Sequence, residues 1–471
     1  MIILRFIPIF FFIAITCGQV YTAHGSEDVT GDSLLVINSI TLIGNKITKD
    51  RIIFRELEFE KGSKLKLSVL DSLIIKSQQN LMNRSLFNFV TVTKQVINNT
   101  CNIQVSVIER WYIWPIPIIQ FADRNINSWW NKRDFSRINY GVDLRVENFR
   151  GLMENLNITV QGGYDLLLAF RWSVPYLTKN QIFGMGIDGG VKLNHEIAYQ
   201  TIDNKEQYYY SQQGYAQRFT FADASFTFRP KFNYLHSFSI GFKQYIVQDT
   251  ILKLNPEYAF SQNTYSFFTL NYQFKLDYRD YKPYPLIGYF FDISLRKSGL
   301  GIFDDQINDY AVEANFDQYV NIYRKWYFAY NFRARFTNQE KRTPYFITSG
   351  LGYFPNTIRG YELYVVDGQK LGIVKSNIKY EVIPKTNFNI SWIKSTKFSE
   401  AYIGIYANVF FDMAYVDDIY TYSMNPLSNQ LLWSTGIGID LITYYDLVLR
   451  LEWSVNKQNK KGFFIGFTAP I

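Results

Sequence analysis

Hydrophobic and polar residues alternate with a period of two along most of the chain. The alternation begins near Trp111 and recurs downstream, clearly in residues 268–278, 326–336 and 447–455. Successive side chains of a β-strand point to opposite faces, so each of these segments predicts a strand with one apolar, aromatic face and one polar face. The pattern predicts that residues 110–471 form an all-β region.

The composition of these strands favours a membrane barrel over a soluble sandwich. Aromatic residues make up 18% of the chain and gather near predicted strand ends, as at Trp129, Trp130, residues 208–210, Tyr444 and Tyr445. Apolar faces bounded by aromatic girdles are typical of transmembrane β-barrels, in which the sheet closes so that every backbone polar group in lipid is paired. The length of the region allows about sixteen antiparallel strands of about 23 residues each, connections included.

Residues 34–109 differ from the rest of the chain because helical and strand patterns are mixed there. Apolar residues recur at helical spacing in two places, and alternating segments flank them. The predicted elements are a strand at residues 36–43, helices near residues 51–57 and at 68–82, and strands at 90–96 and 102–109. This order predicts a small α+β domain.

The first 25 residues have the layout of a secretory signal peptide. Arg5 precedes a short apolar run at residues 6–16, and small residues follow, so cleavage is expected after Gly18 or Gly25. We therefore expect residues 1–25 to be removed and the mature chain to be exported.

The sequence offers little material for catalysis or for metal and cofactor binding. It contains three histidines, and the glycines at 184, 186 and 189 lie in an alternating segment with no helix after them. The two cysteines are Cys17, within the predicted signal peptide, and Cys101, which then has no disulfide partner. The net charge is +8, but the basic residues are dispersed. We expect no enzyme activity, no cofactor, no metal and no nucleic-acid partner.

One electrostatic arrangement stands out. Residues 354–371 contain Pro, Asn, Gly and Asp-Gly turn signals, which predict a long loop between two strands, and Arg359 lies inside it beside Gly360. Alternation in the following strands places Glu381 and Asp412 on the inner, polar face. A guanidinium can bind a carboxylate through two parallel hydrogen bonds. We predict that the loop folds into the barrel, with Arg359 anchored by Asp412 and Glu381 nearby.

The N-terminal region resembles a POTRA (polypeptide-transport-associated) domain. The resemblance is carried by residues 40–65, with a Gly-Asn turn and Arg55-Glu56-Leu57 at a helix end, and by residues 81–87, where Leu-Phe precedes a strand. It implies a periplasmic domain that binds extended segments or lipoproteins by adding a strand to its sheet edge.

The barrel region resembles the outer-membrane assembly-factor superfamily, whose members include BamA, TamA and the two-partner secretion transporters. Two paired motifs carry the resemblance: the loop motif Ile358, Arg359, Gly360 and Tyr361, and residues 410–414 on a late strand around Asp412. A third stretch is similar to the strand-end motif of these barrels: Asp277, Arg279, Asp280, Pro283 and Gly288. The resemblance covers essentially the whole mature chain and supports a count of sixteen strands.

The sequence departs from that pattern in three ways. Ala414 stands where the late-strand motif usually has Gly, and the chain ends in Ala-Pro-Ile at residues 469–471, whereas many barrels end on an aromatic residue. There is one POTRA-like domain, whereas the essential insertases typically carry several. These departures leave the specific role within the superfamily open.

The first and last strands suggest a lateral seam. Pro115 and Pro117 fall in the first predicted strand, where each removes a backbone donor, and Phe463 and Phe467 fall in the last. A weakly paired first strand would let the barrel open sideways and receive a client strand. The alternative is that the two prolines merely mark the linker between the domains.

The resemblance implies a role in inserting or exporting other proteins at the outer membrane of a Gram-negative cell. The expected partners are outer-membrane lipid and unfolded outer-membrane or secreted proteins, together with periplasmic chaperones or accessory lipoproteins. The alternative functions are a dedicated secretion pore, similar to the two-partner transporters, and a solute channel.

Overall fold

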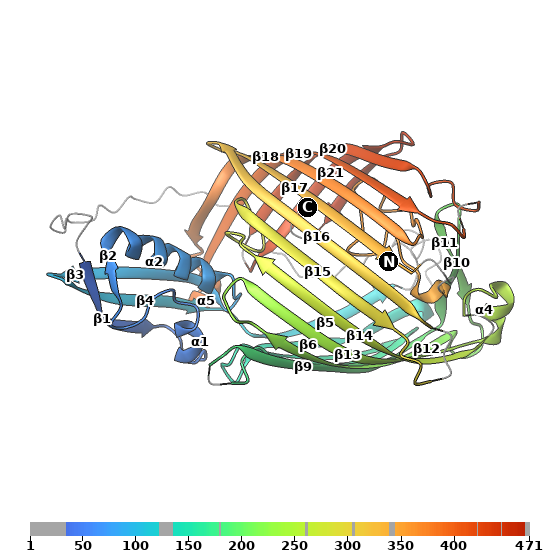
Figure 1. Cartoon of the computed structure of the whole chain (residues 1–471), viewed down its shortest axis with the longest axis horizontal. Helices are drawn as coiled ribbons and strands as arrows, with labels where there is room; N and C mark the ends of the chain where they lie inside the picture. Colours follow the sequence, from blue (N-terminus) through green and yellow to red (C-terminus); the bar gives the residue numbers. More distant parts are fainter. Residues whose placement is uncertain are drawn as a thin grey trace.

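The structure is a computed structural model, and it describes residues 34–121, 135–178, 180–259, 262–303, 307–338, 344–421, 423–443 and 445–466. The predicted signal peptide at residues 1–25 lies outside the described residues, as do Trp129, Trp130, Tyr444 and Phe467. The described residues form a small α+β domain at one end of a large barrel-shaped sheet (Figure 1).

The N-terminal domain packs two helices against a four-stranded sheet whose strand order is β2-β1-β4-β3. Its elements are β1 (Leu34–Ile43), α1 (Asp50–Phe54), β2 (Lys64–Lys66), α2 (Leu67–Met82), β3 (Phe87–Ile97) and β4 (Thr100–Glu109). The apolar face of α2, with Leu70, Ile74 and Leu81, is buried against the sheet. The short strand β2 was not predicted, because three residues are too few to show a period of two.

The remaining strands form one sixteen-stranded sheet, in which every neighbouring pair is antiparallel. In chain order they are β5 (Ile113–Phe121), β6 (Ile138–Phe149), β7 (Glu154–Gly163), β8 (Leu166–Val174), β9 (Phe183–Asn194), β12 (Gln217–Phe228), β13 (Tyr234–Val247), β14 (Thr264–Asp277), β15 (Gly288–Ser298), β16 (Asp309–Tyr323), β17 (Trp326–Thr337), β18 (Lys370–Asn389), β19 (Glu400–Asp417), β20 (Leu431–Thr443), β21 (Leu447–Asn456) and β22 (Lys461–Gly466). The predicted fold class, an α+β domain followed by about sixteen antiparallel strands, is confirmed.

The alternating sequence sets the two faces of the sheet. On β19, Val409 and Phe411 are 55% and 42% exposed on the outer face, whereas Asn408 and Asp412 are buried on the inner face. The same contrast between an apolar outer face and a polar inner face is typical of a membrane barrel. Among the described residues, no helix has the length and apolar character needed to cross a membrane.

The two ends of the barrel differ, and we call the end beside the N-terminal domain proximal and the other end distal (Figure 1). The distal connections carry their own structure: η1 (Phe135–Arg137), the hairpin of β10 (Glu196–Ile202) and β11 (Lys205–Tyr210), α4 (Asp249–Leu254) and η2 (Tyr345–Ile347). The proximal connections include the turn at residues 278–287 and the helix α5 (Thr396–Ser399), which lies between β18 and β19.

Candidate functional site

The long distal loop between β17 and β18 spans residues 338–369, and its described residues 344–369 fold into the barrel. Its described part packs an apolar cluster against the inner face of β18 and β19. Ile358 and Tyr361 on the loop are buried with Leu371 and Ala414 on the wall. Burial of these side chains stabilises the inward position of the loop by the hydrophobic effect.

Arg359 is anchored on Asp412 by a two-pronged ion pair. Its Nε donates to Asp412 Oδ2 at 2.8 Å and its Nη2 donates to Asp412 Oδ1 at 2.6 Å, and the backbone N–H of Arg359 also donates to Oδ2 at 3.1 Å. Arg359 is 7% exposed and Asp412 is fully buried. The carboxylate therefore fixes both the side chain and the backbone of the loop tip.

Further contacts hold the same guanidinium. Its Nη1 donates to Glu452 Oε1 on β21 at 3.4 Å, and its Nη2 donates to the carbonyl oxygen of Ser376 at 3.3 Å. The guanidinium also lies over the ring of Phe410, 3.9 Å from the ring centre. Arg359 thus joins β18, β19 and β21 through one side chain.

The structure corrects the predicted second carboxylate. Glu381 faces the proximal end and accepts a hydrogen bond from the hydroxyl of Tyr406 at 3.1 Å, and Glu452 is the second acidic residue at Arg359. In the β18–β19 ladder Asp412 pairs with Lys375, six positions before Glu381. Alternation predicts which face a side chain takes, but it does not predict its height along the barrel axis.

Gly360 is required by its backbone conformation and by its surroundings. Its φ angle is +78°, and an added Cβ would lie 3.2 Å from Ser434 Cβ and from Ser454 Oγ. The carbonyl oxygen of Gly360 accepts a hydrogen bond from Asn456 at 2.8 Å, and the hydroxyl of Tyr361 donates to Gln458 at 2.7 Å. The four residues of the loop motif therefore all contact the wall formed by β18–β21.

The strand-end motif builds the proximal turn at residues 278–287. Asp277 binds Arg279 through two hydrogen bonds of 2.8 and 2.9 Å, and Asp280 accepts the backbone N–H of Leu286 at 3.1 Å. Gly288 has a φ angle of +105°, and an added Cβ would lie 2.1 Å from the carbonyl oxygen of Tyr278. Pro283 lies inside this turn, immediately before Tyr284. The motif is thus far from Arg359 along the barrel axis.

The predicted seam residues lie on the two edge strands of the sheet, β5 and β22. Within the described residues no hydrogen-bond ladder joins these two strands. The N–H of Glu147 donates to the carbonyl oxygen of Tyr112 at 2.7 Å, so even-numbered residues of β5 bond to β6 and odd-numbered ones face the free edge. Pro115 and Pro117 are odd-numbered, and both therefore lack a donor at the free edge. Phe463 is exposed on β22.

The two edges are held near each other at the proximal end. The rings of Trp114 on β5 and Tyr445, in the turn before β21, lie 5.2 Å apart. Arg110 Nη1 forms an ion pair with Asp446 Oδ2 at 2.6 Å, and the Tyr445 hydroxyl accepts the backbone N–H of Trp111 at 3.1 Å. These contacts close the sheet around its axis although the edge strands share no ladder among the described residues.

Hydrogen bonds join three distal connections into a cap at the distal end of the barrel, which the sequence did not reveal. Asn204, in the turn between β10 and β11, donates to the carbonyl oxygen of Val365 at 3.2 Å and accepts the N–H of Leu427 at 2.9 Å. The N–H of Asn204 donates to Asn425 at 3.0 Å. One buried asparagine therefore joins three connections. Its turn could be read from Asp203-Asn204, but its partners could not.

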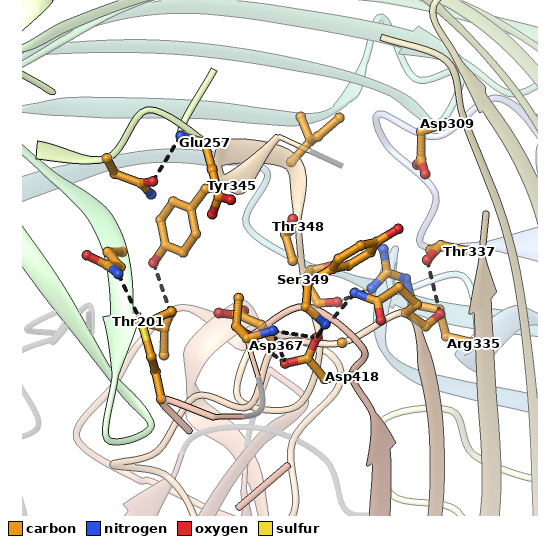
Figure 2. A pocket seen from close by; sticks show the side chains of 18 residues that line it. Thr201, Glu257, Asp309, Arg335, Thr337, Tyr345, Thr348, Ser349, Asp367 and Asp418 are labelled. Carbon is orange, nitrogen blue, oxygen red and sulfur yellow. Dashed lines mark hydrogen bonds between the residues drawn. The ribbon is translucent and has the colours of Figure 1, made fainter. Parts of the chain in front are cut away.

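A small polar cavity lies among the distal connections, and Figure 2 shows the side chains that line it. Thr201 and Tyr345 share a hydrogen bond of 3.0 Å on one side, and Asp367 and Asp418 line another. Its volume of about 50 Å³ suits a few water molecules. In the described part of the chain, no group of three or more His, Cys, Asp or Glu side chains is placed to hold a metal ion.

The N-terminal domain is clasped to the barrel through Glu56. This carboxylate is fully buried and lies 3.0 Å from Arg84 Nε of its own domain, 3.0 Å from Arg229 Nη1 and 2.9 Å from the hydroxyl of Tyr176. Burial alone would raise the pKa of Glu56, but the charges of Arg84 and Arg229 outweigh it and lower the pKa to about 2. Glu56 is therefore ionised at neutral pH and attracts the turn that follows β12.

Comparison with known protein families adds two matches. Residues 148–467 match the Omp85 superfamily domain, and residues 35–110 match a POTRA domain described as a surface antigen variable number repeat. The predicted resemblance to POTRA-plus-barrel assembly factors is confirmed by these matches. No curated protein matches the chain.

Solved structures with a similar fold include CdiB from Escherichia coli, at 9% identity and a TM-score of 0.53, with 92% of this chain and 75% of that chain covered. BamA from Haemophilus ducreyi lacking POTRA domains 1–3 is similar at 15% identity and a TM-score of 0.49, with 92% and 83% covered. At 9% identity, the likeness to CdiB concerns the fold alone.

Proposed function

Because the chain belongs to the Omp85 superfamily, we propose that it inserts or translocates client proteins at the outer membrane of a Gram-negative cell. The POTRA domain lies in the periplasm in this proposal, and the distal cap faces the cell exterior. The clients are unfolded outer-membrane or surface proteins, and accessory lipoproteins or chaperones bind the edge of the POTRA sheet.

The observation that carries the proposal is the free edge of β5. Pro115 and Pro117 both remove a backbone donor from the side of β5 that faces the seam, so a ladder with β22 would lack two hydrogen bonds there. A seam that is weaker than the other strand pairs separates before they do. An incoming client strand would then pair with the exposed edge by β-augmentation.

The distal cap argues against a permanently open solute channel. Asn204 joins the loop at residues 338–369 to the connection around Asn425, and both asparagines are buried. A secretion pore would need this cap to move. Single-channel recording in planar bilayers separates these alternatives, because a solute channel gives a large steady conductance without a client.

Disulfide locking of the seam tests the proposal. Cysteines placed at Ile119 and at Phe463 or Ile465, in a Cys101→Ser background, should crosslink and stop the assembly of outer-membrane clients, and a reductant should restore it. The matched control is Val142→Cys with Val160→Cys, which joins two outward-facing, directly paired positions on β6 and β7 and should leave assembly unchanged. Full client assembly with a quantitatively locked seam would refute lateral opening.

A further inference from the structure

The strand-end motif has no role in the loop anchor, yet its turn reaches the same wall from the opposite end. Tyr284 projects from the turn at residues 278–287 into the proximal lumen, where it is 1% exposed. Its hydroxyl donates to Asp440 Oδ2 on β20 at 2.8 Å. The β14–β15 turn is thus held on the inner face of β20, below the loop that carries Arg359.

A line of buried polar side chains joins the two attachments. Asp440 Oδ1 accepts a hydrogen bond from Arg450 Nε at 3.3 Å, and the same Nε lies 3.6 Å from Glu452 Oε1. Glu452 Oε1 in turn accepts from Arg359 Nη1 at 3.4 Å. Tyr284 and Arg359 are therefore linked through three side chains, all on the inward face of β20 and β21.

The same turn is also fixed to the N-terminal domain. Asn83, the C-cap of α2, donates from its Nδ2 to the carbonyl oxygen of Asp280 at 3.1 Å and accepts the backbone N–H of Lys282 at 2.9 Å. These two bonds hold the turn backbone at residues 280–282, two residues before Tyr284. A shift of the N-terminal domain would move the backbone that places the Tyr284 hydroxyl.

We propose that Tyr284 is a positioning residue, which couples the place of the POTRA domain to the anchoring of the lumenal loop. The coupling runs from Asn83 through the turn to Tyr284, and then through Asp440, Arg450 and Glu452 to Arg359. When Tyr284 donates its hydrogen bond to Asp440, Arg450 lies between Asp440 and Glu452 and contacts both carboxylates. Glu452 can then accept the hydrogen bond from Arg359. This inference rests on the proposed function, and it assigns a role to the turn at residues 278–287, which the proposed function leaves without one.

The test uses a buried cysteine on the loop as a reporter. Val366 is fully buried beneath the cap, so Val366→Cys in a Cys101→Ser background should react with a bulky external maleimide only when the loop leaves the lumen. Tyr284→Phe removes one hydroxyl and keeps the ring, and should raise the labelling rate about tenfold because a hydrogen bond to a charged group is lost. The matched control is Tyr406→Phe. The ring of Tyr406 lies 4.9 Å from that of Tyr284, but its hydroxyl donates to Glu381, which is not one of the residues that link Tyr284 to Arg359.

Asn83→Ala shows whether the coupling reaches the N-terminal domain. If Asn83 and Tyr284 both act through the same chain of contacts to Arg359, Asn83→Ala and Tyr284→Phe should each raise the labelling rate. The double variant should then label no faster than the faster single variant. Multiplied effects in the double variant, or equal rates for Tyr284→Phe and Tyr406→Phe, would overturn the inference. Heat-modifiability on gels reports whether each barrel is folded, and Asp440→Asn replaces Tyr284→Phe if the latter fails that check.

Client assembly is measured on the same variants as a separate readout. Faster labelling of Tyr284→Phe with normal client assembly would support the coupling and show that client assembly does not depend on the anchoring of the loop. Unchanged labelling would overturn the coupling whatever the client assay shows, and would leave the proposed function standing.

Discussion

Arg359→Ala should release the lumenal loop. The substitution removes both charge-assisted hydrogen bonds to Asp412 and leaves a fully buried carboxylate without its main partner. Breaking a buried ion pair from one side costs about 3–5 kcal/mol. Lys375 lies opposite Asp412 in the β18–β19 ladder, and a basic residue beside the unpaired carboxylate reduces the cost. We therefore expect the lower end of this range, about 3 kcal/mol.

A cost of about 3 kcal/mol raises the open fraction of the loop roughly a hundredfold. The labelling rate of Val366→Cys by an external maleimide should rise by the same factor if opening is fast and reversible, and Tyr361 should become accessible to external reagents. In Arg359→Lys the labelling rate of Val366→Cys should lie between the rates of the wild type and Arg359→Ala, about tenfold above the wild type, because an ammonium group cannot form both hydrogen bonds of the pair.

The carboxylate variants decide which acid holds the loop. Asp412→Asn should approach the effect of Arg359→Ala, Glu452→Gln should have a smaller effect because its bond to Arg359 is 3.4 Å long, and Glu381→Gln should have none. The exchange Arg359→Asp with Asp412→Arg should recover part of the anchoring relative to either single change. If Asp412→Asn labels at the wild-type rate while Glu381→Gln matches Arg359→Ala, the assignment of the partner is wrong. If no carboxylate matters, the anchored-loop mechanism fails.

Three further predictions concern the POTRA domain and the strand-end motif. The pKa of Glu56 is lowered from 4.5 to about 2, so its contribution to docking should be complete above about pH 4.5 and be lost as the pH falls toward 2. The rate at which protease releases residues 34–109 from opened envelopes should rise as the pH falls through that window, and in Glu56→Gln this rate should already be raised at pH 7. Proteolysis of intact cells should spare residues 34–109 and proteolysis of opened envelopes should release them, and release from intact cells would reverse the topology. Gly288→Ala should destabilise the barrel by more than about 1 kcal/mol in heat-modifiability assays, because alanine is strained at its φ angle of +105°, whereas Gly372→Ala, with open space around it, should be neutral.

The period-two pattern allowed the fold to be predicted because a barrel strand meets two different solvents. Lipid on one side and a polar lumen on the other force each side chain to a face, so the inward positions of Asp412 and Glu381 both followed from alternation. The sequence alone left the heights of these two residues on the barrel wall open. Arg359 meets Asp412 and Glu452 because strand register brings them to one level, and register depends on turn lengths and bulges such as the one after Glu381.

Contacts between segments that are distant in the sequence could not be predicted either, because they too depend on how the strands are arranged in the folded barrel. Asn204 and Glu56 each bind partners that lie more than a hundred residues away, and although Glu56 falls in a recognised stretch, nothing in the sequence indicates those partners. The strand-end motif shows the opposite case. Asp277, Arg279 and Gly288 were recognised from a resemblance, and their contacts with one another are local, but the reach of Tyr284 to Asp440 became visible only in the folded barrel.

Attachments of different kinds hold strands on the two sides of the seam. The N-terminal domain holds the turns that follow β8, β12 and β14 through contacts with Tyr176, Arg229 and Asp280, and the lumenal loop holds β18, β19 and β21 through Arg359. Across the seam at the proximal end, Arg110 forms an ion pair with Asp446, and the two side chains are 6% and 13% exposed. For the seam to open along its whole length, as proposed, this ion pair has to break, because it joins the segment before β5 to the turn before β21.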